Sequence, residues 1–226
     1  MIKLVNVNKT YSRNIKVLRD INLFINAGEF VSLVGQSGTG KTTLMKTLIS
    51  EERVDSGQIL IGDWDITRIS RREVPYLRRQ IGVIFQDFKL LPQKTLRENV
   101  AFALEVCGQS SKKIDRVVST VMRIVGLEDK MDRYPNEVSG GEQQRTAIAR
   151  SLVHQPKILL ADEPTGNLDS INANEIIDLL LRINNFGTTV VLVTHNRDVV
   201  NSLKKRVITV ENGAIINDQE NGRYLL

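Results

Sequence analysis

Short runs of apolar residues alternate along this chain with segments whose apolar residues recur every three or four positions. The runs predict buried strands at residues 30–35, 81–85, 157–164 and 188–195. The helical spacing predicts helices at residues 41–50, 95–108, 113–126 and 170–183. Residues 206–216 have the pattern of a hairpin with Asn-Gly at its turn. Strands that alternate with helices favour an α/β domain with a mostly parallel core sheet.

The two ends of the chain depart from this alternation. Residues 1–30, which begin MIKLVNVNKTYS, carry strand patterns with no helix between them, whereas residues 95–138 are helical without a strand. We therefore expect one domain over residues 1–226. Its core would comprise about 1–94 and 157–226, with a small antiparallel β part near the N-terminus, and about 95–156 would form an inserted helical part.

Composition narrows the class of protein. With 226 residues and 41% hydrophobic content, the chain has enough material for one large core. It contains no run of about 18 apolar residues, and its N-terminus lacks the apolar centre of a signal peptide. Cys107 is the only cysteine, which excludes an intrachain disulfide and fits a reducing compartment. The net charge of +5 is scattered and aromatic residues make up only 5%, so we expect no nucleic-acid partner.

The stretch GQSGTGKTT, residues 35–43, follows a predicted strand and opens a predicted helix. This spacing, G-x-x-x-x-G-K-[ST], is typical of a phosphate-binding loop, because its backbone N–H groups and the helix N-terminus attract anions. Lys41 would reach the β- and γ-phosphates, and the Thr42 hydroxyl would ligate Mg²⁺. The expected nucleotide-binding residues of this stretch are Gly35, Ser37, Gly38, Thr39, Gly40, Lys41, Thr42 and Thr43.

A second signal is KILLADEP, an apolar strand that ends in two acids. Ligands of open α/β sheets bind at the carboxyl ends of the strands. Asp162 and Glu163 stand at such an end, so we expect both side chains to lie beside the bound nucleotide. Asp162 would hold Mg²⁺, and Glu163 would act as the general base on the attacking water.

The stretch VSGGEQQRTAIAR, residues 138–150, resembles the signature motif of ABC-type ATPases. Further motifs of that family match in order: an aromatic residue near the N-terminus, a glutamine after IGVIF, GNLD at residues 166–169, and a histidine after VVLVT. The resemblance implies a P-loop NTPase core that hydrolyses ATP, with each nucleotide clasped between two copies of the chain. Ser139 precedes the helix expected from Gly140, which gives a second anion-binding helix start.

The resemblance also implies the remaining roles. Gln86 and His195 would be catalytic, and Gln86 would join Thr42 and Asp162 at Mg²⁺. The other nucleotide contacts would come from Tyr11, which stacks on adenine, and from Ser139, Gly140, Gly141, Glu142 and Asp169. Glu142 stands where Gln is commoner, so it can accept a hydrogen bond from a ribose hydroxyl but cannot donate an amide hydrogen bond. Val138 replaces the commoner Leu and keeps its apolar packing.

In this family the nucleotide-driven motion passes to an integral membrane protein, so we expect the chain at the cytoplasmic face of a membrane. Phe88, Leu90 and Leu91, next to Gln86, would be exposed for that contact, with the alternative that they fill the helical core. REVPYLRRQIGVIFQDFKLL, residues 72–91, resembles the cell-division branch, and Pro75 would disfavour helix at Val74.

Three alternatives stay open. The nearest relatives of that branch release lipoproteins or export macrolides and peptides. A soluble ABC-type protein acting on DNA or ribosomes would need a long coiled coil or a second ATPase domain, and a phosphate-loop kinase would leave Ser139–Glu142 without a role.

Overall fold

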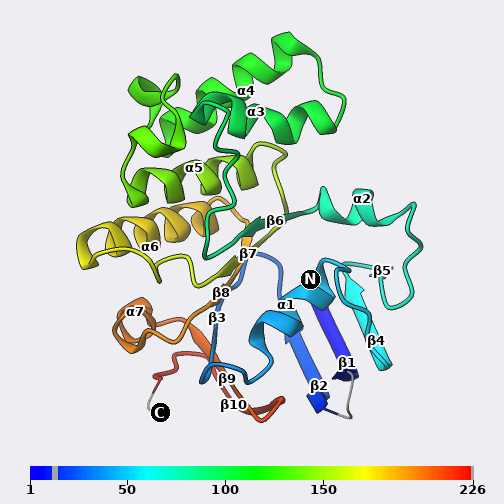
Figure 1. Cartoon of the computed structure of the whole chain (residues 1–226). Coiled ribbons are helices and arrows are strands. Elements are labelled where there is room, and N and C mark those ends of the chain that lie inside the picture. Colours follow the sequence, from blue (N-terminus) through cyan, green and yellow to red (C-terminus); the bar gives the residue numbers. More distant parts are fainter. Residues whose placement is uncertain (12–14, 225–226) are drawn as a thin grey trace.

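The computed structural model describes residues 1–11 and 15–224, so Ser12, at the end of the predicted N-terminal strand, lies outside it. Figure 1 shows the helices of the middle of the chain gathered above the sheets, with the N-terminal strands on the opposite side. The predicted parallel sheet, the predicted antiparallel sheet and the predicted helices of the middle of the chain are all present. The α/β fold with a mostly parallel sheet is therefore confirmed.

The larger sheet has six strands in the order β10-β9-β3-β8-β7-β6. All neighbours pair in parallel except β9 and β10, the predicted hairpin. Every residue of β3 and β8 is buried, which explains why these strands are almost entirely apolar, with Ser32 and Thr189 as the polar exceptions. The strands are β3 (Phe30–Val34), β6 (Ile81–Ile84), β7 (Ile158–Asp162), β8 (Thr189–Val193), β9 (Arg206–Glu211) and β10 (Ala214–Gln219).

The smaller sheet is antiparallel, in the order β2-β1-β4-β5. Its strands are β1 (Ile2–Tyr11), β2 (Ile15–Ile25), β4 (Ser56–Ile61) and β5 (Trp64–Asp65). Arg206, on β9, connects the two sheets. Its guanidinium donates to both carboxylate oxygens of Asp218 at 2.7 and 2.6 Å, to Glu29 at 2.8 Å, and to the Phe24 carbonyl at 2.9 Å. This arginine therefore fixes the antiparallel sheet to the edge of the parallel one.

The helices divide between the two faces of the parallel sheet. Alternate residues of β7 and β8 contribute to two separate core clusters. One cluster contains α1 and the antiparallel sheet, and the other contains α3, α4, α5 and α6. The helical part therefore shares one core with the sheet. The longer helices are α1 (Lys41–Leu48), α3 (Leu96–Val106), α4 (Ser111–Ile124), α5 (Gly140–Leu152), α6 (Ser170–Asn185) and α7 (Arg197–Leu203).

One local prediction is wrong. A short helix, α2 (Val74–Arg78), begins at Val74, where Pro75 was expected to disfavour helix. Pro75 lies in its first turn, where a backbone N–H has no partner within the helix, so the proline costs little there. Two short 3₁₀ turns, Glu128–Lys130 and Pro135–Glu137, lead into α5. Within residues 1–11 and 15–224, no helix is long and apolar enough to cross a membrane.

Candidate functional site

The predicted phosphate-binding loop connects β3 to α1. A Cβ atom added at Gly35 would lie 2.2 Å from the Val210 carbonyl oxygen, and a Cβ atom added at Gly40 would lie 2.6 Å from the Val17 carbonyl oxygen. Both distances are too short for a side chain, so the loop needs glycine at these two positions. No side chain caps the first turn of α1, which leaves its N–H groups available to an anion. The buried Lys41 ammonium donates to the carbonyl oxygens of Gly35 at 2.7 Å and Gln36 at 2.8 Å. Burial lowers the pKa of Lys41, although the negative charges of Glu163 and Asp162 oppose this shift.

A cavity of about 410 Å³ brings together Thr42, Gln86 and Asp162, the three predicted Mg²⁺ ligands. Burial, and then the charge of Glu163, raise the pKa of Asp162, while a hydrogen bond from Thr42 opposes the shift. The described residues contain no cluster of three or more His, Cys, Asp or Glu side chains suited to a metal. The hydroxyl oxygen of Thr42, the amide oxygen of Gln86 and a carboxylate oxygen of Asp162 are ligands that suit Mg²⁺. Proteins usually hold Mg²⁺ with few side chains, and substrate phosphates supply further ligands.

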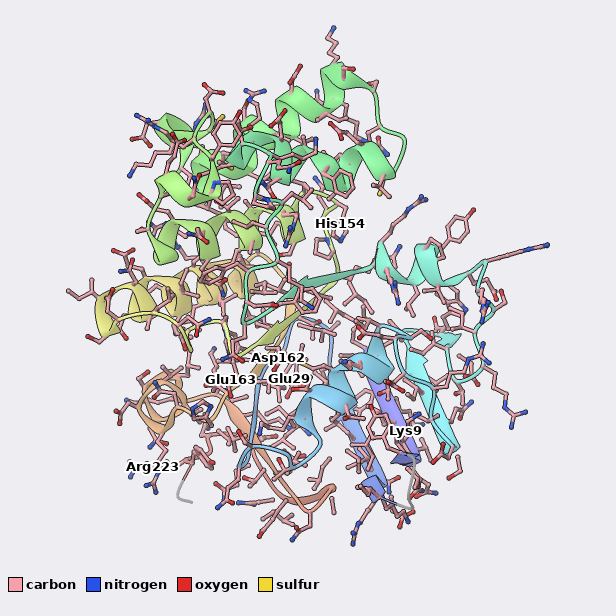
Figure 2. All side chains as sticks on the ribbon, in the orientation of Figure 1. Lys9, Glu29, His154, Asp162, Glu163 and Arg223 are labelled. Carbon is pink, nitrogen blue, oxygen red and sulfur yellow. The ribbon has the colours of Figure 1, made fainter. Side chains whose placement is uncertain are left out.

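The two predicted catalytic residues, Glu163 and His195, are in direct contact. Nδ1 of His195 lies 2.6 Å from Oε1 of Glu163, and the Thr194 hydroxyl donates to Oε2 at 3.2 Å. The Glu163 backbone adopts a left-handed conformation, with φ of +47°, and its N–H donates to the Val193 carbonyl at 2.9 Å. Figure 2 shows Asp162 and Glu163 near the middle of the molecule, at the end of β7. The Glu163 carboxylate is therefore oriented by the two residues that directly follow β8.

The segment after Gln86 is fixed by two residues that sequence reasoning missed. Phe88 and Lys89 both have left-handed backbone, and Arg150 of α5 donates to their carbonyl oxygens at 2.8 and 2.6 Å. The fully buried Asn99 of α3 accepts from the Leu91 N–H at 2.7 Å. Its amide also donates to the carbonyls of Leu91, Lys94 and Thr95 at 2.9–3.0 Å. A buried Asn within a helical pattern was the available sequence signal.

The three apolar residues predicted to meet a membrane partner are neither fully exposed nor part of the core. Phe88, Leu90 and Leu91 are half-buried, and neither main core cluster includes them. The expectation of exposure is therefore met only in part, since the segment folds back onto α3 and α5. The alternative that these residues fill the helical core is not what the structure has.

The signature segment has the predicted helix start. Ser139 caps α5, and Glu142 completes a capping box: the hydroxyl accepts from the Glu142 N–H at 3.3 Å, and the carboxylate accepts from the Ser139 N–H at 2.8 Å. Glu142 also forms an ion pair with Lys130. Lys130 and this capping lower the pKa of Glu142. Because its oxygens already have these partners, the contact with a ribose hydroxyl stays a prediction and would use the remaining lone pairs.

Asp169 has a structural position that the sequence analysis did not anticipate. It is the N-cap of α6, where it accepts from the N–H groups of Ile171 and Asn172 at 3.0 and 2.9 Å. A Cβ atom at Gly141 would lie 2.2 Å from Oδ1 of Asn172, so the starts of α5 and α6 lie against each other. The predicted nucleotide role of Asp169 stays a prediction.

The predicted residues form two groups within one chain. The phosphate loop opens α1 on one face of the parallel sheet, whereas the signature motif opens α5 on the other face, as Figure 1 also shows. Gly140 is the first residue of α5. Tyr11 is the last residue of β1 and is half-buried, and the Lys9 ammonium lies 5.1 Å from the centroid of its ring. Within a single chain the phosphate loop and the signature motif lie on opposite faces of the parallel sheet. A nucleotide that contacts both would therefore need the signature motif of a second copy of the chain.

Comparison with known proteins agrees with these features. A family model described as ABC transporter matches residues 18–166. The chain is 50% identical over 224 residues to the cell division ATP-binding protein FtsE of Bacillus subtilis, covering 99% of this chain and 98% of that protein. It is 48% identical over 225 residues to FtsE of Mycobacterium tuberculosis (99% and 98%), and 43% identical over 213 residues to that of Escherichia coli (94% and 96%).

Two solved structures have the same fold. The dimer of the ATP-binding cassette MJ0796, in a post-hydrolysis state with ADP and Pi, has a TM-score of 0.89 and 35% identity, covering 99% of this chain and all (100%) of that one. The cbiO1 subunit of a Clostridium perfringens ABC transporter complex has a TM-score of 0.90 and 31% identity, covering 97% and 88%.

Proposed function

Because this chain belongs to the ABC transporter family of ATPases, we propose that it is the ATP-hydrolysing subunit of a bacterial cell-division complex. In this proposal, ATP-driven closure of a homodimer acts on an FtsX-like membrane protein and thereby activates cell-wall hydrolases. The observation that carries it is the contact between Glu163 and His195 beside a phosphate-binding loop, in a chain whose FtsE relatives match along nearly its whole length.

Nucleotide binding begins at the loop. The N–H groups of residues 35–43 and the first turn of α1 would surround the phosphates. Lys41 would exchange its two carbonyl partners for the β- and γ-phosphates. Thr42, Asp162 and Gln86 would hold Mg²⁺, which supplies positive charge to the phosphate oxygens.

Hydrolysis then needs a base. Glu163 would accept the proton of a water whose oxygen forms a bond to the γ-phosphorus, while the bond to the ADP oxygen breaks. The Thr194 hydroxyl and the His195 ring hold the Glu163 carboxylate from both of its oxygens. This two-point contact would keep the base oriented without a movement at the moment of reaction.

The second half of the site would come from another copy. Ser139 and the first N–H groups of α5 would form an anion-binding helix start, which lies on the face of the sheet opposite to α1. In a two-fold dimer, each nucleotide would lie between the Lys41 loop of one copy and the Ser139 helix of the other. The solved dimer with ADP and Pi, at 35% identity, supports this arrangement.

The membrane partner would dock beside Gln86. Phe88, Leu90 and Leu91 form a half-buried apolar surface outside the main core clusters, held by Arg150 and Asn99. A short helix of the partner would pack there, which places the complex at the cytoplasmic face of the cell membrane. We expect Leu90→Glu to abolish co-purification of an FtsX-like subunit, whereas Ile216→Glu, on exposed β10, keeps it. Equal capture by both variants would refute this docking surface.

The central experiment is Glu163→Gln. This change removes the basic carboxylate and keeps the size of the side chain, so the variant should bind ATP, fail to hydrolyse it, and accumulate as a dimer. Turnover is measured by phosphate release and dimerisation by light scattering after ATP addition. Glu220→Gln, in an exposed turn, is the matched control and should behave as the unmodified chain. Normal hydrolysis by Glu163→Gln would exclude Glu163 as the base, and a strictly monomeric variant would exclude the shared site.

A further inference from the structure

A cavity of about 1060 Å³ lies far from the proposed nucleotide site, between α4, α6 and the end of α5. Lys157, just before β7, and Thr189, at the start of β8, line it. These strands pair in parallel, and their other ends lead to Asp162 and Glu163 on β7 and to His195 after β8. The cavity is therefore at the edge of the sheet opposite to the proposed site of hydrolysis.

Two helices form the walls of this cavity, and each presents an apolar stripe to it. Val117, Val121 and Ile124 of α4 are spaced by four and three residues, which places them on one helical face. Leu179 and Ile183 of α6, followed by Phe186, have the same spacing. The floor is buried, but Ile124 is 48% exposed and Phe186 is 87% exposed.

The rim of the cavity is uniformly basic. Arg116, Arg123, Lys157 and Arg182 are all exposed and line the cavity, whereas its lining contains no Asp or Glu. Arg123 pairs with Glu128 at 3.1 Å. The other three form no ion pair within residues 1–11 and 15–224. Arg123 and Arg182 also line an adjoining cavity that contains Glu175 and Asp178. The groove itself combines an apolar floor with a lining whose charged side chains are all cationic.

From this arrangement we propose that the groove binds an amphipathic helix of another protein, with a narrow apolar stripe flanked by acidic residues. The stripe would pack between α4 and α6 and add a third helix to the pair, and the acids would meet the basic rim. A flat lipid surface fits less well, because it would contact Phe186 but would not reach the recessed residues Leu179 and Val121, which are 2% and 8% exposed.

This docking surface does not depend on the proposed ATPase cycle. It shares none of its lining residues with the cavity that contains Thr42, Gln86 and Asp162. Binding there requires neither a nucleotide nor a second copy of the chain. A failure of one proposal therefore leaves the other standing.

The test uses a fluorescein-labelled synthetic peptide of about three heptads, with Leu at positions a and d and Glu at e and g. A second peptide carries Lys in place of every Glu. Anisotropy titrations with the full chain should show binding of the Glu peptide that weakens as salt is raised, and markedly weaker binding of the Lys peptide. No binding of the Glu peptide, or equal binding of the two peptides, would overturn the proposal.

Variants locate the binding surface. Arg116→Glu combined with Arg182→Glu should weaken binding of the Glu peptide about tenfold and strengthen binding of the Lys peptide. Arg71→Glu combined with Arg72→Glu changes the net charge equally at an exposed turn, and should leave both affinities nearly unchanged. Phe186→Glu should also weaken the Glu peptide, whereas Phe24→Glu, on exposed β2, should not.

Two further readouts keep the outcome clear. Circular dichroism and ATP hydrolysis should be unchanged in the Arg116/Arg182 variant, which excludes unfolding as the cause. Flotation with phosphatidylglycerol vesicles tests the lipid alternative. Vesicle binding that this variant loses, with no binding of the Glu peptide by the unmodified chain, would make the groove a lipid site and refute the proposal.

Discussion

Asn99 offers a sharp test of how the segment after Gln86 is held. Its side-chain oxygen accepts from the Leu91 N–H, its two amide hydrogens are shared among the carbonyls of Leu91, Lys94 and Thr95, and it is fully buried. At roughly 0.5–1.5 kcal/mol of net stability for each of these three hydrogens, Asn99→Ala should lower the free energy of unfolding by about 3 kcal/mol. For a chain of this size that corresponds to a fall in Tm of roughly 6–12 °C.

The assay is urea unfolding of the full chain, followed by circular dichroism, with Asn185→Ala as the control. Asn185 is exposed at the end of α6, so its replacement should change the free energy of unfolding by less than about 0.5 kcal/mol. The Asn99→Ala variant should also lose capture of the proposed membrane partner, because Leu90 and Leu91 lose their support. A loss of less than about 1 kcal/mol, with normal capture, would refute the claim that Asn99 fixes this segment.

Three further predictions concern the stability of the site and of the joined sheets. The raised pKa of Asp162 means that the folded chain binds its proton more tightly than the unfolded chain does. Asp162→Asn should therefore raise the free energy of unfolding at pH 7, and this gain should vanish as pH falls below the ordinary carboxyl pKa, as urea titrations across pH would show. Arg206→Met should cost about 3 kcal/mol in the same assay, with Arg206→Lys intermediate, and an equal cost for both would contradict the role of the bidentate contact. Gly35→Ala should cost about 3 kcal/mol or more through its clash with a carbonyl oxygen, whereas Gly38→Ala, which meets nothing within 4 Å, should cost about 1–2 kcal/mol from its positive φ alone.

The sequence was sufficient for features whose physical cause is local. Buried strands such as β3 and β8 are apolar except for Ser32 and Thr189, and the Asn212–Gly213 turn adopts the left-handed conformations that these two residues favour. Ser139 caps α5 as its position before two glycines predicted. In each case the residues that determine the structure are adjacent along the chain.

The features that sequence reasoning missed depend on contacts between distant segments. Arg150 follows Lys89 by 61 positions, and nothing near either residue indicates that the guanidinium supports a left-handed backbone. The pairing of Glu142 with Lys130 likewise requires the 3₁₀ turn that brings the lysine beside α5. The α2 helix was missed for a different reason, because the rule for the residue before proline is weak in a first helical turn.

The backbone of Glu163 has a consequence for attempts to make this protein more heat-resistant. A side chain at φ of +47° is held in a conformation that glycine or asparagine adopts at lower energy, and burial raises the pKa of the neighbouring Asp162 carboxyl. Screening a mutant library only for survival of heating should therefore enrich replacements at positions 162 and 163. With the roles proposed above for Asp162 and Glu163, such winners would melt later and turn over no ATP, so thermal tolerance and catalysis would compete for the same two positions.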